Sequence, residues 1–205
     1  MTKQALVTFG LVTLLASAAQ ANQQQLASSI KDVQIETRRT EAQLAATMGT
    51  LNALKKQTKG DLRPAYEAYC AEVSKTGSAA AWTKTRVQWM ASDGRQYFTS
   101  WQSTINGIAN ESLRKKAQKR LDAVKESYDK VEKSFQEAAV KFKPFLSDLG
   151  DIQKSLATDI TAGGVKAIKS TVKSANWNHN YVDKAVKSAL KEMDKMRKAL
   201  STEAK

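Results

Sequence analysis

The chain has 205 residues, of which 41% are hydrophobic and 26% charged, and it contains only 2 Pro, 9 Gly, 1 Cys and 1 His. So few turn-forming residues exclude a Pro-rich linker, a collagen repeat and an all-β domain, which leaves helix as the dominant structure. One cysteine and one histidine exclude an internal disulfide and nearly every transition-metal site, so neither a metal nor another cofactor is expected. The 33 Lys and Arg against 20 Asp and Glu give a net charge of +13, which favours anionic partners.

Residues 1–21 have the three parts of a secretory signal peptide. A short basic start precedes an apolar run from Ala5 to Ala19, and the small-residue triplet Ala19-Gln20-Ala21 follows. We therefore predict cleavage after Ala21 and a periplasmic product, residues 22–205, that forms one helical domain. A transmembrane anchor is the alternative, but it needs about 20 strongly apolar residues and this run is shorter. No cysteine directly follows the run, and the only cysteine, Cys70, lies far downstream, so no bacterial lipid anchor is expected.

Apolar and small polar residues recur in alternating steps of four and three along four segments, with no Lys, Arg, Asp or Glu among them. A period of 3.5 residues is typical of helices that pack as a left-handed coiled coil. Short connections between the segments predict antiparallel neighbours. The expected fold is all-α, an elongated antiparallel helical bundle of three to four long helices with heptad packing. The four stripes run from Leu26 to Leu54, from Leu62 to Ile108, from Ala117 to Leu156 and from Ile168 to Leu200.

Turn-forming residues separate the four stripes. They lie at Lys59-Gly60-Asp61, at 106–110 and at Ala162-Gly163-Gly164. Asn110, with Glu111 and an apolar residue close behind it, is predicted to cap the start of the third helix.

Three further positions weaken the helical pattern inside the second and third segments. These are Gly77-Ser78, Asp93-Gly94 and Pro144. Because the heptad phase continues across all three, we interpret them as kinks or brief breaks and not as domain boundaries. For Pro144 the alternative is a helix that ends near Lys143 and restarts with the proline in its first turn.

Aromatic side chains are concentrated in the second segment. Those on the stripe, such as Tyr69 and Trp101, are expected in the core, although an aromatic cluster can also form a ligand groove. Three tryptophans lie off the stripes and are candidates for a second packing seam or a surface that binds a partner. They are Trp82, Trp89 and Trp177.

The single histidine and the single cysteine provide few side chains that could act in catalysis. His179 lies on the fourth stripe among three asparagines, where we expect a hydrogen-bonded polar residue that fixes helix register; orienting a substrate or sensing acid is the alternative. Cys70 is expected to be buried and inert, with an intermolecular disulfide as the alternative. The sequence contains no phosphate-binding loop, nucleophile elbow or His-Glu-x-x-His motif, so we expect no enzyme.

Two groups of basic residues form the candidate surface for an anionic polymer or a membrane. A solvated helix face is the ordinary explanation for such groups, and acidic residues interleave with the second of them. Export argues against nucleic acid as the partner. The two groups are Arg114, Lys115, Lys116, Lys119 and Arg120, and Lys184, Lys187, Lys191, Lys195 and Lys198.

Several of these positions resemble the pattern of a known family. The most specific stretch is Asn110-Glu111-Ser112-Leu113-Arg114, supported by Trp101, Tyr128 and the segment 139–151 with Pro144. On these residues the chain resembles a bacterial domain-of-unknown-function family of exported, all-helical coiled-coil proteins of about this length. The resemblance implies a coiled-coil fold and export, and it brings no activity and no functional residues.

The function expected from the sequence is therefore that of a non-enzymatic helical scaffold or protein-interaction module of the cell envelope. Its partner would be an envelope protein or a second copy of the chain. The alternative is a binder of an anionic envelope polymer or lipid headgroup through a basic helix face.

Overall fold

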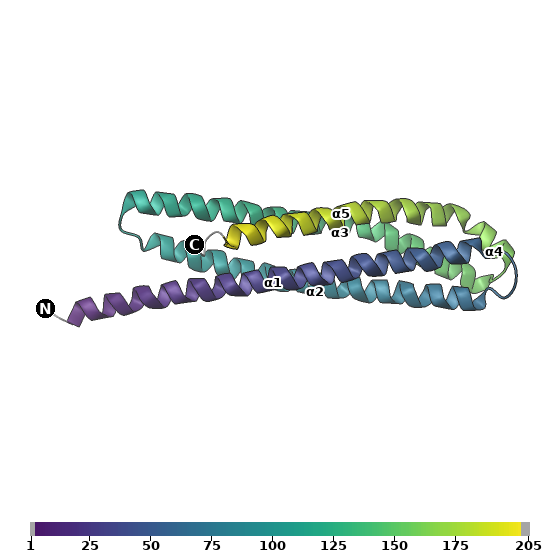
Figure 1. Ribbon diagram of the computed structural model, residues 1–205, viewed down its shortest axis with the longest axis horizontal. Coiled ribbons are helices and arrows are strands. Elements are labelled where there is room, and N and C mark those ends of the chain that lie inside the picture. Colours follow the sequence, from purple (N-terminus) through teal and green to yellow (C-terminus); the bar gives the residue numbers. More distant parts are fainter. Residues whose placement is uncertain (1–2, 202–205) are drawn as a thin grey trace. The chain divides into compact units, whose positions relative to one another are not determined.

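The described part of the chain is almost entirely helical. The computed structural model describes the backbone of residues 3–201 and the side chains of residues 20–201. Within these residues there are four long helices, one short helix and no strand (Figure 1). The helices are α1 (Lys3–Lys56), α2 (Arg63–Asn106), α3 (Glu111–Thr158), α4 (Ala162–Ala167) and α5 (Lys169–Ser201). The predicted all-α helical bundle is thus confirmed, whereas the signal peptide predicted for residues 1–21 lies mostly outside the described side chains.

The chain divides into two compact units, and each of the four long helices contributes a segment to both. Unit 1 comprises the residues up to Gln34, Arg86–Glu132 and the residues from Lys191 onward. Unit 2 comprises Ile35–Thr85 and Lys133–Leu190, and it contains α4.

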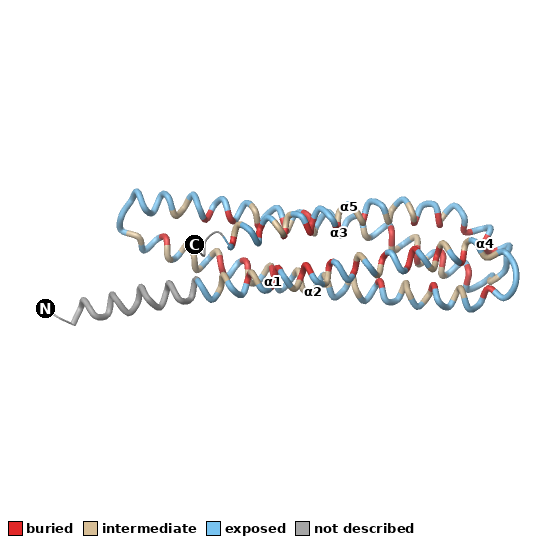
Figure 2. The backbone as a smooth tube through the Cα atoms, viewed as in Figure 1, coloured by how far each residue is buried: buried red, intermediate tan, exposed pale blue. Residues whose placement is uncertain are grey.

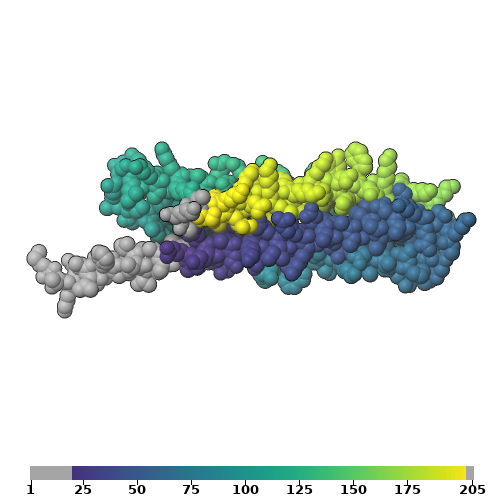
Figure 3. All heavy atoms as spheres, viewed as in Figure 1, coloured from purple at the N-terminus to yellow at the C-terminus, as the bar shows by residue number. Residues whose placement is uncertain are grey.

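In unit 2 the four long helical segments pack side by side around a closed circuit. Each helix forms a polar contact with two neighbours, and the residue numbers of neighbouring helices run in opposite directions, as antiparallel packing requires. The contacts around the circuit are Thr47–Thr76 (2.7 Å), Tyr69–Leu149 (2.9 Å), Asn178–Asp148 (2.7 Å) and Lys187–Glu41 (4.0 Å). The space-filling view shows α5 at the surface beside α1, as the last of these contacts requires (Figure 3).

Unit 1 repeats the same circuit with other residues. Ser29 donates to the Asp93 carboxylate between α1 and α2, and the remaining helices are joined by bonds of ordinary length. Those bonds are Tyr128 to the Met90 carbonyl (3.1 Å), Arg120 to the Ala199 carbonyl (3.0 Å) and Gln34 to Asp194 (2.8 Å).

The heptad stripes form the interior of both units. Every residue of the stripe from Leu26 to Leu54 is buried, and in the stripe from Ile168 to Leu200 only His179 is less than fully buried. Buried positions recur along each helix at this spacing (Figure 2). No described stripe residue is exposed, although most residues of the stripe from Leu62 to Ile108 are half-buried. The sequence pattern therefore identified the inward face of each helix and not every core residue.

Two of the three predicted connections are confirmed, and each has a local cause. Gly60 adopts a φ of 79°, which only glycine reaches without strain, in the connection between α1 and α2. The Asn110 side chain accepts a hydrogen bond from the Leu113 amide at 3.0 Å, so it caps α3 as predicted.

The third connection was predicted at the wrong place. α3 ends at Thr158, and Gly163 and Gly164 lie inside the short helix α4, whose N-cap is Thr161. A Cβ at Gly164 would lie 2.0 Å from the Asp159 carbonyl oxygen. The glycine therefore permits a close approach of the backbone here and does not mark the turn itself.

The positions that weaken the pattern do not interrupt the helices. α2 continues through Gly77 and Gly94, and α3 continues through Pro144. The alternative of a helix restarting at Pro144 is therefore wrong. At Gly94 there is a packing reason for glycine, because a Cβ would lie 2.5 Å from Cζ of the buried Tyr128.

Candidate functional site

A groove between α3 and α5 in unit 2 is the candidate site. It is open, has a volume of about 630 Å³ and combines lysines with apolar side chains. We call it the α3–α5 groove. It is lined by Lys133, Gln136, Glu137, Val140 and Lys141 of α3 and by Tyr181, Lys184 and Ala185 of α5.

Large apolar side chains are exposed along and beside this groove. Val140 is 68% exposed, Trp177 61% and Tyr181 44%. The Trp177 and Tyr181 rings pack edge to face with centroids 6.0 Å apart, and Lys141 Nζ lies 5.7 Å from the centre of the Tyr181 ring. These contacts join a predicted partner-surface residue, Trp177, to side chains that the sequence analysis did not select.

The lysines of the groove lack acidic partners. No described acidic side chain forms an ion pair with Lys133, Lys141 or Lys184, and Glu137 is the only acidic residue in the lining. Three lysines against one glutamate leave the groove positively charged. An anionic ligand would therefore meet charges that are not already neutralised within the fold.

The other two predicted partner-surface residues lie on α2, outside the groove. Trp82 is 56% exposed and Trp89 51%. The Arg86 guanidinium lies 4.8 Å from the centre of the Trp89 ring and 3.5 Å from the Asp32 carboxylate. This cation–π contact covers part of Trp89 and gives its ring a structural role.

All ten predicted basic residues are exposed, but several are already engaged. Lys115, Lys187 and Lys195 pair with acidic residues one helical turn away at 2.7, 2.8 and 2.7 Å. Arg114 donates to a backbone carbonyl at 3.1 Å and Arg120 to another at 3.0 Å. The charge available to a ligand on these faces is therefore smaller than the residue count suggests.

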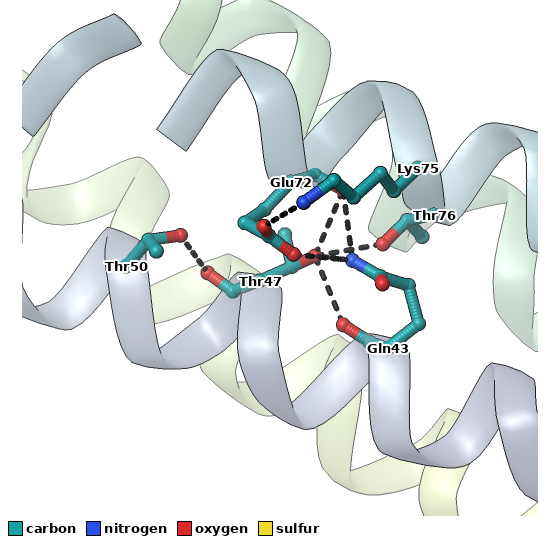
Figure 4. Close-up of polar contacts among 6 residues, drawn as sticks. All are labelled: Gln43, Thr47, Thr50, Glu72, Lys75 and Thr76. Carbon is teal, nitrogen blue, oxygen red and sulfur yellow. Dashed lines mark hydrogen bonds and ion pairs between the residues drawn. The ribbon is translucent and has the colours of Figure 1, made fainter. Parts of the chain in front are cut away.

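A polar seam in unit 2 joins α1 to α2 (Figure 4). Thr47 donates to the Glu72 carbonyl oxygen at 3.1 Å and lies 2.7 Å from Thr76, while Gln43 donates to the Glu72 carboxylate at 2.6 Å. Hydrogen bonds from Lys75 and then from Gln43 hold the pKa of Glu72 below its usual value. Because these bonds satisfy one another, the seam has a structural role in pairing the two helices and offers no free group to a ligand.

We expect the paired substitutions Thr47→Val and Thr76→Val to test this seam. Thr47→Val leaves the buried Thr76 hydroxyl without its partner, so the free energy of unfolding should fall by about 1 kcal/mol. Thr76→Val should cost less, because the Thr47 hydroxyl still bonds to the Gln43 and Glu72 carbonyl oxygens. The double variant removes both hydroxyls and should recover part of the loss. Urea unfolding of the four proteins measures the coupling, and strictly additive losses would contradict the pairing.

The single histidine lies on the fourth stripe, but within the described residues its ring lacks the hydrogen bond that was predicted for it. His179 is half-buried, with its ring centre 5.8 Å from that of Phe145. Burial lowers the pKa of His179 below its usual value of 6.5, partly opposed by the carboxylate of Asp183. One turn before His179 on α5, the side-chain amide of Asn176 forms hydrogen bonds of 3.4 to 3.5 Å with that of Asn52 on α1. Cys70 is half-buried with a free thiol.

Acidification should destabilise the fold through His179. A pKa that is lower in the folded state means that the unfolded chain binds more protons, so stability falls as the pH drops below about 6.5. Thermal unfolding followed between pH 7.5 and about 5 should show a smaller loss in His179→Gln than in the parent. An identical pH profile for the two proteins would contradict this contribution.

None of the described helices has a stretch long and apolar enough to cross a membrane. Within the same residues, no group of three or more His, Cys, Asp or Glu side chains is arranged to hold a metal ion.

The structure adds residues to the site that the sequence analysis missed. Val140, Lys141 and Lys133 were passed over because they lie off the stripe, where exposed side chains are ordinary. The available signal was a large apolar residue at an outward heptad position, directly before a lysine. This pattern indicates a binding site only once it is known that α3 lies beside Tyr181 of α5.

Comparisons with known proteins give a family and nothing further. A family model described as "Protein of unknown function (DUF2959)" matches residues 16–200. Neither the curated proteins nor the solved structures contain a significant match to the chain.

Proposed function

We propose, for a chain that belongs to the DUF2959 family of proteins of unknown function, the role of an exported, non-enzymatic helical scaffold that binds a protein in the bacterial cell envelope. The observation that carries this proposal is the exposed cluster of Val140, Trp177 and Tyr181. The heptad stripes already form the interior, so these exposed apolar side chains are not required for packing of the core. Clustered exposed apolar side chains are typical of interaction sites.

Export is the second part of the proposal, and it rests on the signal-peptide pattern of residues 1–21. Mass spectrometry of the chain recovered from the periplasmic fraction should give a product that begins at Asn22. Retention of Met1 in a product confined to the cytoplasmic fraction would contradict export.

The surroundings of the one histidine support the non-enzymatic part of the proposal. His179 packs against Phe145 and has Asp183 and Lys187 as its charged neighbours. A pair of titratable groups tuned for acid and base catalysis needs a shared pocket. The α3–α5 groove contains no histidine and no cysteine, so binding is the activity that its side chains support.

Site-specific photo-crosslinking tests the protein-binding role. A photoreactive amino acid in place of Trp177 should give one defined adduct in envelope preparations, because this side chain is exposed beside the groove. The same amino acid in place of Ser78, an exposed residue of α2, is the matched control. Absence of an adduct at 177, or the same adducts at both positions, would contradict the proposal.

Binding of an anionic envelope polymer or lipid headgroup is the second candidate function. It is favoured by the exposure of all ten predicted basic residues of the two groups, Arg114 to Arg120 on α3 and Lys184 to Lys198 on α5. Binding to phosphatidylglycerol vesicles should weaken steeply as the salt rises past about 0.15 M, where the screening length is about 8 Å. Equal binding to uncharged phosphatidylcholine vesicles, or binding that salt does not change, would eliminate this candidate.

A further inference from the structure

The α3–α5 groove is about as long as two turns of a helix. Its α3 residues, from Lys133 to Lys141, are spaced so that they form one face of the helix, and its α5 residues, from Tyr181 to Ala185, do the same. Eight residue steps of about 1.5 Å give the α3 face a length of about 12 Å, or roughly two helical turns. The groove is thus bordered by two antiparallel helices and is open along its length.

The apolar side chains in this groove call for an apolar stripe on the occupant. Val140 and Tyr181 line it, and Trp177 extends the apolar surface from Tyr181 by one turn of α5. An amphipathic helix presents apolar residues at the spacing that fits such a row. A glycan chain would leave Val140 without an apolar partner, and a flat membrane surface cannot follow a concave groove.

The charges call for acidic residues beside that stripe. Lys133, Lys141 and Lys184 lie around the groove without a described acidic partner, while Glu137 is the one opposing charge. A second copy of this chain carries the same excess of +13, so self-association in this groove brings like charges together.

We propose that the α3–α5 groove binds an acidic amphipathic helix of a partner protein. This inference rests on the proposed protein-binding function and specifies the partner's chemistry. The apolar stripe of the partner helix packs on Val140 and Tyr181, and its acidic residues pair with Lys141 and Lys184. Burial of the apolar stripe supplies affinity, and the charge pairs fix orientation and exclude basic helices.

A direct binding measurement with a defined probe tests the inference. The probe is a stapled peptide of about 18 residues with leucine at every third or fourth position and glutamate on the flanks, because shorter unstapled peptides are poorly helical in water. Fluorescence anisotropy with the full chain should show saturable binding of this peptide. The same peptide with lysine in place of glutamate should bind at least about tenfold more weakly.

Charge-matched variants locate the binding site on the chain. The double variant Lys141→Glu/Lys184→Glu should weaken peptide binding by about tenfold or more, since two attractive contacts become repulsive. Lys143→Glu/Lys173→Glu changes the same charge on the same two helices at exposed positions outside the lining and should cost about twofold or less. Val140→Glu should also weaken binding by about tenfold, because it places a charge in the apolar part of the groove. Circular dichroism of each variant verifies that its helices are intact.

The outcomes separate this inference from the proposed function. If the acidic peptide does not bind, or if both double variants weaken it equally, the inference is overturned. An adduct at position 177 would then still support a protein partner of other chemistry. Binding of phosphatidylglycerol vesicles that depends on Lys141 and Lys184, without peptide binding, would also overturn the inference and assign the groove to lipid headgroups.

Discussion

Replacing Phe145 by alanine should lower the free energy of unfolding by about 3–5 kcal/mol, the largest effect expected of any single change considered for this chain. The Phe145 side chain is fully buried in unit 2, with the rings of Phe142 and His179 5.9 and 5.8 Å from it. Truncation leaves a cavity between α3 and α5 that the surrounding helices cannot fill. Urea unfolding monitored by circular dichroism measures the loss.

Val140→Ala is the matched control for this prediction. Val140 lies on the same helix but is 68% exposed, so its truncation should change the free energy of unfolding by less than about 0.5 kcal/mol. Similar losses for the two variants would contradict the assignment of Phe145 to the interior.

The second large effect is expected from alanine at two glycines of α2. Gly77 has no atom within 4 Å of an added Cβ, so Gly77→Ala should stabilise the helix by about 0.5–1 kcal/mol. At Gly94 the Cβ would lie 2.5 Å from the ring of Tyr128, which is buried and donates to the Met90 carbonyl. Overpacking of this kind costs about 1–3 kcal/mol, so the free energies of unfolding of the two variants should differ by about 1.5–4 kcal/mol.

The order of the two glycine variants is the informative result. Thermal unfolding should place Gly77→Ala above the parent and Gly94→Ala below it. Equal stability of Gly94→Ala and Gly77→Ala would contradict the close packing of α2 against Tyr128 of α3.

The core was predictable from the sequence because burial in a helical bundle follows a strict period. The stripe from Leu26 to Leu54 was identified without knowledge of any tertiary contact, and all of its residues are buried. The cap at Asn110 was predictable for a similar reason, since capping depends on residues close in sequence.

The candidate site was less predictable because it depends on which helices are neighbours. All four long helices share one heptad period, so the pattern does not say that Lys141 of α3 lies over the ring of Tyr181 of α5. The exposure of Trp177 followed from its position off the stripe, but its place beside a basic groove did not.

The misplaced third connection has a different cause. Ala162-Gly163-Gly164 has the composition of a turn, yet Thr161 caps a short helix that begins there. Gly164 is needed for contact with the Asp159 backbone, and close approach and turn formation favour the same residue. Composition alone does not separate these two uses.

The most direct test of the account is the reactivity of single cysteines in a Cys70→Ser background. Cysteines introduced at the stripe positions Leu44, Val131 and Met193 should react with a bulky maleimide more than about a hundredfold slower than those at Val140 and Trp177, because labelling of an interior thiol requires local opening. Equal labelling rates at the two sets of positions, in protein that keeps its helical circular dichroism, would show that the stripes do not form the interior.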